Sequence, residues 1–283
     1  MPWTEATRGQ YRRSGLRYAS DLTDAEWALI ARRMPARCRR GRPRTVELRR
    51  VVEAVLFILS TGCQWRALPK DYPPYSTVQG YFHAWRDSGR WRNIAAALVC
   101  RARCALGRTA KPAMAVIDGQ STAATQAGGP RGYDAGKRIH GRKRHIVTDS
   151  NGLLLAAHVH PANVQDCHGA VALLRDPRSR LPKLRHVFAD RVYRGPQLLH
   201  ALAGSGPWTI EIVERPKGVK GVKGFQLLPR RWVVERTFAW LGRCRRLTRD
   251  FEGSPATEAA WIFIAHIRML TRRLAAKRTN LDL

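Results

Sequence analysis

The chain has 283 residues, which suits one large domain or two small ones with a real hydrophobic core. Lys and Arg number 51 against 21 Asp and Glu, a formal net charge of +30 at pH 7. That charge favours a polyanionic partner, either nucleic acid or an anionic membrane surface. We find no secretory signal and no apolar run of the ~18 residues that a membrane span requires. We therefore expect a cytoplasmic protein with a nucleic-acid partner, and no membrane partner.

The first third of the chain has the pattern of short helices. Residues 1–20 are expected to be a flexible N-terminus, and residues 21–107 a small all-helical domain. Thr23 and Glu26 form a capping box that predicts the start of the first helix. These helices fit either a helix-turn-helix-like DNA-binding module or an ordinary helical bundle.

Two further helices of this region have recognisable ends. Thr45 is the expected N-cap of a helix that Gly62 ends, and Ser76 is the expected N-cap of the next one. A last helix is expected from about residue 90 to 106, before a linker at 107–112.

The pattern changes after this linker. Residues 113–118 form a short apolar run typical of a buried strand, and two strands flank the turn "DSNG" as a hairpin. Helices and strands then alternate, and two helical segments close the chain. This order predicts an α/β domain over residues 112–283, a mixed sheet flanked by helices.

Two predicted strands end in an aspartate: Asp118 in "VIDGQS" and Asp190 in "FADRVY". Groups at the carboxyl ends of strands in α/β sheets face the ligand crevice. If these strands are parallel neighbours, the two carboxylates lie side by side, which is unfavourable without a cation. Oxygen ligands suit Mg²⁺ or Mn²⁺. The pair therefore indicates a metal site.

Glu235 is the candidate for a third ligand. It lies near the start of "RRWVVERTFAWLGRCRRLTRD", residues 230–250, which reads as one helix rich in arginine. Its apolar side, with Val234, Phe238 and Leu241, is expected to face the core. Taken alone, Glu235 could equally form an i,i+4 ion pair with Arg231. The two strand-end aspartates favour the metal-ligand interpretation.

Several stretches together resemble a bacterial insertion-sequence transposase of the DDE superfamily, in the insertion-sequence-five group. They include "RGRPRTVELRRVVEAVLFILSTGCQWRALPKDYPPYSTVQGYFHAWRDSG", "VIDGQST", "KRIHGRKRHIVTDSNGLLLAAHVHPANVQD", "FADRVYRG" and "RRWVVERTFAWLGRCRRL". The resemblance covers about residues 18–253. It implies an RNase H-like catalytic domain in which Asp118, Asp190 and Glu235 are the catalytic and metal-binding residues.

The resemblance also implies an activity: metal-dependent cleavage and strand transfer of the protein's own element on double-stranded DNA. Two Mg²⁺ ions are implied as cofactors, with Mn²⁺ as a substitute, and a homodimer in the synaptic complex, at the bacterial nucleoid. An RNase H-like nuclease or resolvase without strand transfer, and a non-catalytic DNA-binding protein, are the alternatives. Around Glu235 the chain keeps Arg231, but Leu228 and Gly242 replace the family's Tyr and Lys, and Arg243 is one position late.

Phosphate contacts are expected from basic segments in four regions. The candidates are Arg42, Arg142, Lys143, Arg144, Lys217, Lys220, Lys223, Arg231, Arg236 and Arg243. Each run could instead be a solvated surface. Asp166 is most simply the N-cap of the helix after the hairpin, although its position could also bring it near the metals.

Overall fold

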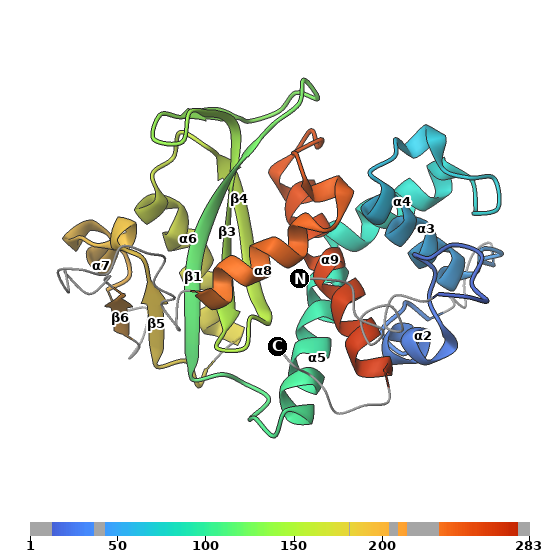
Figure 1. Ribbon diagram of the computed structural model, residues 1–283, viewed down its shortest axis with the longest axis horizontal. Helices are drawn as coiled ribbons and strands as arrows, with labels where there is room; N and C mark the ends of the chain where they lie inside the picture. Colours follow the sequence, from blue (N-terminus) through green and yellow to red (C-terminus); the bar gives the residue numbers. More distant parts are fainter. Residues whose placement is uncertain (1–12, 37–42, 181, 204–208, 214–231, 277–283) are drawn as a thin grey trace, which may run out of the picture.

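A six-stranded mixed sheet organises the second half of the chain (Figure 1). The computed structural model describes residues 13–36, 43–180, 182–203, 209–213 and 232–276. Its strands are β1 (Met114–Ala123), β2 (Gly132–Asp134), β3 (Ile139–Asp149), β4 (Leu154–Pro161), β5 (His186–Ala189) and β6 (Thr209–Ile212). The sheet order is β2-β3-β1-β5-β6, with β4 also paired to β3. The predicted α/β class is confirmed.

The strand directions make this sheet RNase H-like. β1 and β3 are antiparallel, as are β3 and β4, whereas β5 is parallel to β1 and β6 is parallel to β5. The predicted hairpin around "DSNG" is the β3–β4 pair. The short strand β2 was not predicted, because three residues carry too little pattern to be recognised.

The helices lie before the sheet in the sequence, between its strands, and after it. They are α2 (Asp24–Ala31), α3 (Leu48–Thr61), α4 (Tyr75–Asp87), α5 (Arg90–Ala105), α6 (Asp166–Arg180), α7 (Pro196–Ala201), α8 (Trp232–Gly242) and α9 (Pro255–Ala275). Three single-turn 3₁₀ helices, η1 (Trp65–Ala67), η2 (Arg191–Tyr193) and η3 (Arg245–Leu247), complete the described elements. No helix of the described ranges is long and apolar enough to cross a membrane.

The predicted helix ends are partly confirmed. Thr23 and Glu26 form the expected capping box, and Gly62 ends α3 in the left-handed conformation at φ 72°. Thr45 and Ser76 are not N-caps: α3 begins after Glu47 and α4 after Pro74, and neither residue makes a side-chain cap hydrogen bond. In α4 the preceding proline supplies the non-helical entry that the serine was expected to supply.

The arginine-rich segment is shorter as a helix than its pattern suggests. α8 ends at Gly242, and the chain then turns through Cys244 in an extended conformation into η3. The prediction of one helix over residues 230–250 is therefore wrong beyond Gly242. Glycine costs about 1 kcal/mol in a helix relative to alanine, so it favours an end at this point.

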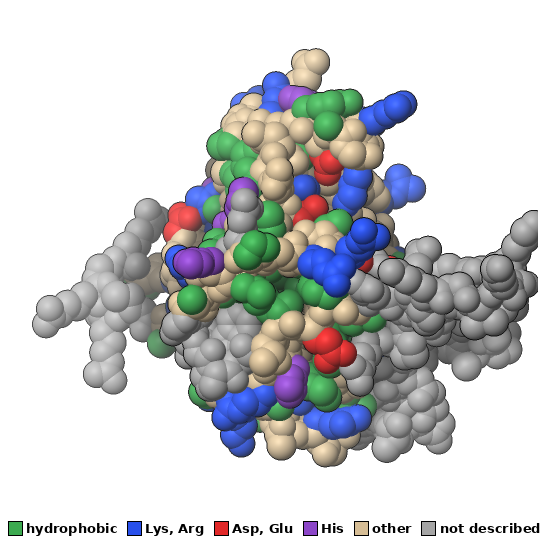
Figure 2. Space-filling view, turned by 90° about the vertical axis from the view of Figure 1, so that its left-hand side faces the viewer, with side chains coloured by type: hydrophobic (Ala, Val, Ile, Leu, Met, Phe, Trp, Pro, Cys, Tyr) green, Lys and Arg blue, Asp and Glu red, His purple; other side chains and the backbone are tan. Residues whose placement is uncertain are grey.

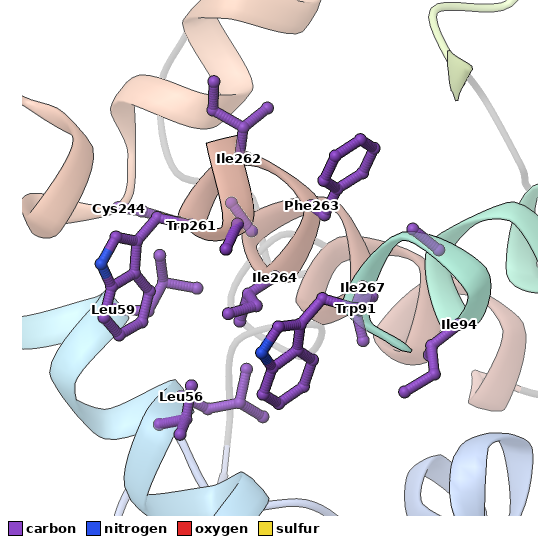
Figure 3. Close-up of a cluster of buried hydrophobic side chains, with 14 of the residues drawn as sticks. Leu56, Leu59, Trp91, Ile94, Cys244, Trp261, Ile262, Phe263, Ile264 and Ile267 are labelled. Carbon is purple, nitrogen blue, oxygen red and sulfur yellow. The ribbon is translucent and has the colours of Figure 1, made fainter. Parts of the chain in front are cut away.

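The last helix, α9, packs against the N-terminal helices as well as the sheet. Trp261, Ile264 and Ile267 lie close to Leu56 and Leu59 of α3 and to Trp91 and Ile94 of α5 (Figure 3). All seven side chains are buried in one hydrophobic cluster. The division into domains at residues 107–112 stays a prediction, because this cluster includes side chains from both sides of it.

The two faces of the sheet bury different residues. Alternate side chains of a strand point to opposite faces. Ala115 and Ile117 of β1 pack with α6 and α7, whereas Val116 packs with α8 and α9. Figure 1 shows α6 and α7 on one side of the strands and α8 and α9 on the other. We call these sides the α6 face and the α8 face.

Three residues predicted to contact DNA are instead buried in the protein. Arg142, Lys143 and Arg144 of β3 are 0%, 4% and 3% exposed. Arg142 forms an ion pair with Asp250 at 2.8 Å, and Arg144 pairs with Glu258. The prediction that these three form a DNA-contacting surface is wrong, because acids up to 114 residues away in the sequence neutralise the arginines inside the fold.

The Arg142–Asp250 pair predicts a large effect on stability. Removing one partner of a buried pair leaves the other charge without compensation in a low-dielectric interior, which costs about 3–5 kcal/mol. We expect Asp250→Ala to lower the free energy of unfolding by that amount, measured by urea denaturation. The matched control is Asp71→Ala, which removes an ion pair with Arg17 at 3.8 Å between side chains that are half exposed. It should cost no more than about 1 kcal/mol. Equal losses in the two variants would contradict this account.

Candidate active site

The parallel pairing of β1 with β5 brings Asp118 and Asp190 near each other. Asp190 directly follows β5, as predicted, but the prediction that the first strand ends at Asp118 is wrong, because β1 continues to Ala123 in its pairing with β3. The two strands are parallel neighbours, with Ala115 opposite Val187 and Val116 opposite Phe188. Continuing this register by two residues places Asp118 beside Asp190. Neighbouring strands lie about 4.8 Å apart, so the two aspartates adjoin each other. The prediction that these strands are parallel neighbours is confirmed.

Strand alternation assigns both aspartates to the α8 face. Asp118 has the same parity as Val116, and Asp190 the same parity as Phe188; both apolar residues belong to the cluster that includes α8. Both aspartates are half-buried. Each folds one carboxylate oxygen back onto the chain: the amide of Gly119 donates to Asp118 Oδ1 at 2.7 Å, and that of Arg191 to Asp190 Oδ1 at 2.5 Å.

Glu235 lies in the first turn of α8, and α8 packs against β1 and β3. Val234, Phe238 and Leu241 are buried beneath the helix as predicted, whereas Glu235 is exposed. These three buried side chains hold α8 against the α8 face of the sheet, the face to which Asp118 and Asp190 are assigned. Thr237 fixes it further by donating a hydrogen bond to the Gly152 carbonyl at 2.9 Å.

The donor set fits a hard divalent cation only in part. Asp118 and Asp190 offer oxygen ligands from two neighbouring strands, which suits Mg²⁺ or Mn²⁺. Within the described ranges, however, no three Asp, Glu, His or Cys side chains are gathered closely enough to hold one ion. The structure thus brings together two of the three predicted ligands and puts the third on the helix that covers the same face.

Cationic side chains lie next to both aspartates. Lys137 is exposed in the β2–β3 turn. Its Nζ donates a hydrogen bond at 3.3 Å to the carbonyl of Gly119, the residue that follows Asp118. Arg191 is exposed directly after Asp190. Neither was among the predicted DNA-contacting residues. Lys137 begins the basic run at 137–145, from which only Arg142, Lys143 and Arg144 were predicted, and Arg191 is a cation outside any of the runs considered. Their positions favour an anionic ligand in front of the two carboxylates.

Arg236 and Arg243, which were predicted to contact DNA, differ in their exposure and in the groups around them. Arg243 is exposed, just beyond the end of α8. Arg236 is half-buried: its guanidinium lies 4.3 Å from the Trp232 ring centre and 4.7 Å from that of Trp240, and it donates to the Asn151 carbonyl. Its charge is thus partly taken up by aromatic faces and a carbonyl. The predicted residues Arg42, Lys217, Lys220, Lys223 and Arg231 lie outside the described residues.

Figure 2 views the molecule from the side of α7 and β6. Lys and Arg side chains are scattered there among hydrophobic groups, histidines and a few carboxylates, over the part that the structure describes. The described surface in this view has no continuous basic patch. On this described face, single cations are therefore more informative than the total charge.

A group of buried polar residues lies on the α6 face behind Asp118. His145 and His160 are 0% and 7% exposed, and their rings stack with centres 4.8 Å apart. Asp166 is in the first turn of α6, where its carboxylate is 3.4 Å from Lys143 Nζ and 3.5 Å from His145 Nε2. Asp166 thus belongs to the helix itself and interacts with the sheet, so its predicted role as N-cap is wrong.

His158 and His160 alternate on β4 and so share one face of that strand, and the contact of His145 with them was not predicted. The cross-strand register sets His145 opposite His158, and Lys143 opposite His160. The available signal was the hairpin itself, but counting outward from "DSNG", with Thr148 opposite Leu154, sets His145 opposite Ala157, one residue short of the observed partner. The β-bulge at Val147 and Thr148 shifts that count, which is why the pairing could not be read from the turn alone.

Comparison with known proteins agrees with this geometry. The family model for a transposase DDE domain matches residues 110–270, more than half of the chain. The chain belongs to the DDE transposase family. A second model, described as "Putative transposase of IS4/5 family", matches residues 22–95, within the N-terminal helices.

One curated protein is similar in sequence to part of this chain. It is described as "Putative transposase for insertion sequence element IS402" from Burkholderia cepacia, and it is 39% identical over 119 residues. The match covers 40% of this chain and 54% of the relative, so it spans about half of that protein's length. No solved structure matches the chain.

The histidine stack predicts that Gly169 of α6 cannot be replaced. A Cβ there would lie 2.1 Å from His160 Nε2 and 3.0 Å from His145 Nε2. Since both rings are buried, we expect Gly169→Ala to lower the free energy of unfolding by about 1–3 kcal/mol in chemical denaturation. The matched control is Gly80→Ala in α4, where a Cβ meets nothing within 4 Å. It should raise stability by about 0.5–1 kcal/mol. A stabilising Gly169→Ala would show that α6 does not approach the histidines so closely.

Proposed function

We propose that this protein is a DNA transposase, which cleaves DNA at the ends of its own insertion sequence and joins those ends to target DNA. The observation that carries the proposal is the juxtaposition of Asp118 and Asp190 on two neighbouring parallel strands, in a chain of the DDE transposase family. Phosphoryl transfer requires little covalent chemistry from the protein. It depends mainly on positioning of the reacting groups and on electrostatic stabilisation of the transition state.

Asp118, Asp190 and Glu235 are the proposed catalytic carboxylates, and they would hold two Mg²⁺ or Mn²⁺ ions. When bound, divalent cations activate the attacking water or DNA 3′-hydroxyl and stabilise the leaving oxygen. The half-burial of both aspartates favours such ligands, since two adjoining carboxylates repel each other unless a cation lies between them. The packing of α8 on β1 supports Glu235 as the third carboxylate.

Exposed cations near the carboxylates are the proposed phosphate contacts. Lys137 and Arg191 flank the two aspartates, and Arg243 follows α8. They replace Arg142, Lys143 and Arg144, whose charges are used inside the fold. The contacts proposed for Arg42, Lys217, Lys220, Lys223, Arg231 and Arg236 stay as predictions. A positively charged approach to the site orients the DNA backbone without reading its sequence.

The N-terminal helices are proposed to recognise the ends of the element. The start of α4 exposes Tyr75, Ser76 and Gly80, and the connection from α3 to α4 is longer than the 3–4 residues of a helix-turn-helix turn. Of the two predicted interpretations, a helix-turn-helix in the strict sense is therefore less well supported than a helical module of another kind. Two element ends require two active sites, so a homodimer on double-stranded DNA is proposed, at the nucleoid in the cytoplasm.

The proposal is tested with a supercoiled plasmid carrying the DNA that flanks this gene, plus Mg²⁺ and the purified protein. We expect nicking at the element ends and joined products. Asp118→Asn, Asp190→Asn and Glu235→Gln should each reduce cleavage at least about 100-fold, because each removes a proposed metal ligand. The matched control is Asp24→Asn, a carboxylate with a 93% exposed side chain on α2. At a protein concentration that saturates the DNA, so that recognition by the N-terminal helices does not limit the rate, it should cleave like the wild type.

The same assay distinguishes the alternatives. Cleavage without joined products would indicate a nuclease or resolvase. Binding without any cleavage would indicate a non-catalytic DNA-binding protein. Cleavage that survives Asp118→Asn or Asp190→Asn would disprove the proposed site.

A further inference from the structure

A chain of buried polar contacts runs across the α6 face, directly behind the two aspartates. The Tyr193 hydroxyl lies 3.1 Å from His145 Nδ1, and His145 Nε2 lies 3.5 Å from Asp166 Oδ1. The same Asp166 oxygen is 3.4 Å from Lys143 Nζ, which also donates to the Val164 carbonyl at 2.9 Å. Tyr193, His145 and Lys143 are each at most 4% exposed. Such a chain is costly to bury unless its members satisfy one another.

The protonation states give the chain a direction. Burial, followed by the charge of His160, holds the pKa of His145 well below its usual value, so its ring is neutral. Burial, followed by the negative charges of Asp118, Asp166 and Asp190, holds the pKa of Tyr193 well above its usual value, so the phenol keeps its proton. The Asp166 carboxylate, 3.5 Å from His145 Nε2, favours the tautomer with its proton on Nε2, and in that tautomer Nδ1 accepts the hydrogen bond from the Tyr193 hydroxyl.

This chain contacts the backbone beside both aspartates. Gly119 follows Asp118 and faces His145 across the β1–β3 ladder. A Cβ at Gly119 would lie 3.0 Å from Asp166 Oδ1 and 3.1 Å from His145 Cε1. Tyr193 closes η2, the single turn that begins directly after Asp190. One imidazole thus touches the part of β1 that carries Asp118 and is hydrogen-bonded to the turn that follows Asp190.

We infer that His145, Tyr193 and Asp166 are positioning residues, which hold the middle of β1 and the turn after β5 so that Asp118 and Asp190 share one cation. The inference rests on the proposed function of those two carboxylates. None of the three positioning residues needs to touch DNA: they act from the opposite face of the sheet. The β1–β5 ladder stops at Val116 and Phe188, two residues before each aspartate, so it does not itself hold Asp190 against Asp118, which stays paired with Ile146 of β3.

The test is a Mn²⁺ titration of the full chain without DNA, followed by electron paramagnetic resonance. Tyr193→Phe removes the hydroxyl and keeps the ring. We expect its Kd for Mn²⁺ to rise about 10-fold, the lower range for loss of a hydrogen bond that supports a metal site. The matched control is Tyr72→Phe, in which another buried tyrosine, 4% exposed, loses a 2.5 Å hydrogen bond to Asp21. Its Kd should stay within about twofold of the wild type.

Thermal melting is recorded in parallel, since both substitutions remove one buried hydrogen bond and should destabilise similarly. An Mn²⁺ affinity that falls equally in both variants, or in neither, overturns the positioning role. If Tyr193→Phe does not fold, Asp166→Asn provides the same comparison, with the same expected loss. A wild type that binds no Mn²⁺, or that binds it equally well after Asp118→Asn, overturns the proposed metal site, and the positioning role with it.

Discussion

The parallel pairing of β1 with β5 is the constraint on which the site depends. Its register places two carboxylates next to each other, at a separation where they repel in a partly buried environment. A protein keeps such an arrangement only if something else compensates for it. Around this pair the chain provides Lys137 and Arg191 at the surface and a neutral His145 behind the strands. A cation between the carboxylates would complete that compensation, which is why the geometry favours metal-dependent chemistry on an anionic substrate.

Several of the arginines in this basic chain are buried and paired with acids. Buried arginines pair with Asp149, Asp250, Glu252 and Glu258, so several of the few acids in the chain are neutralised inside the fold. Asp250, Glu252 and Glu258 lie between α8 and the first turns of α9, and through Arg142 and Arg144 they tie this segment to β3. Burial raises the pKa of Glu258 to about 8 despite its arginine partner, which shows how unfavourable that environment is for charge. The same ion pairs that remove β3 from the DNA surface therefore connect the sheet to the helices that cover it.

Local patterns were enough to predict most of the order of the elements, Asp190 at the end of its strand and the buried side of α8, whereas β1 continues past Asp118 to Ala123. These features depend on periodicity and on the residue at an element's end, both of which are visible within about ten residues. The exposure of Arg142 and Arg144 was mispredicted, because their partners Asp250 and Glu258 lie more than 100 residues away. The end of α8 at Gly242 and the pairing of His145 with Tyr193 likewise depend on tertiary contacts. The proposed role of Glu235 combines both kinds of information, since its helix was predictable and its distance from the aspartates was not.

Iron-directed cleavage of the polypeptide tests the central claim most directly. Fe²⁺ occupies carboxylate sites for divalent cations, and with ascorbate and peroxide it generates radicals that cut only the nearby backbone. The account predicts cuts in three segments far apart in the sequence, around residues 118, 190 and 235, all suppressed by excess Mg²⁺. Cuts at only one of these segments, or cuts that Mg²⁺ does not suppress, would contradict a shared metal site formed by Asp118, Asp190 and Glu235.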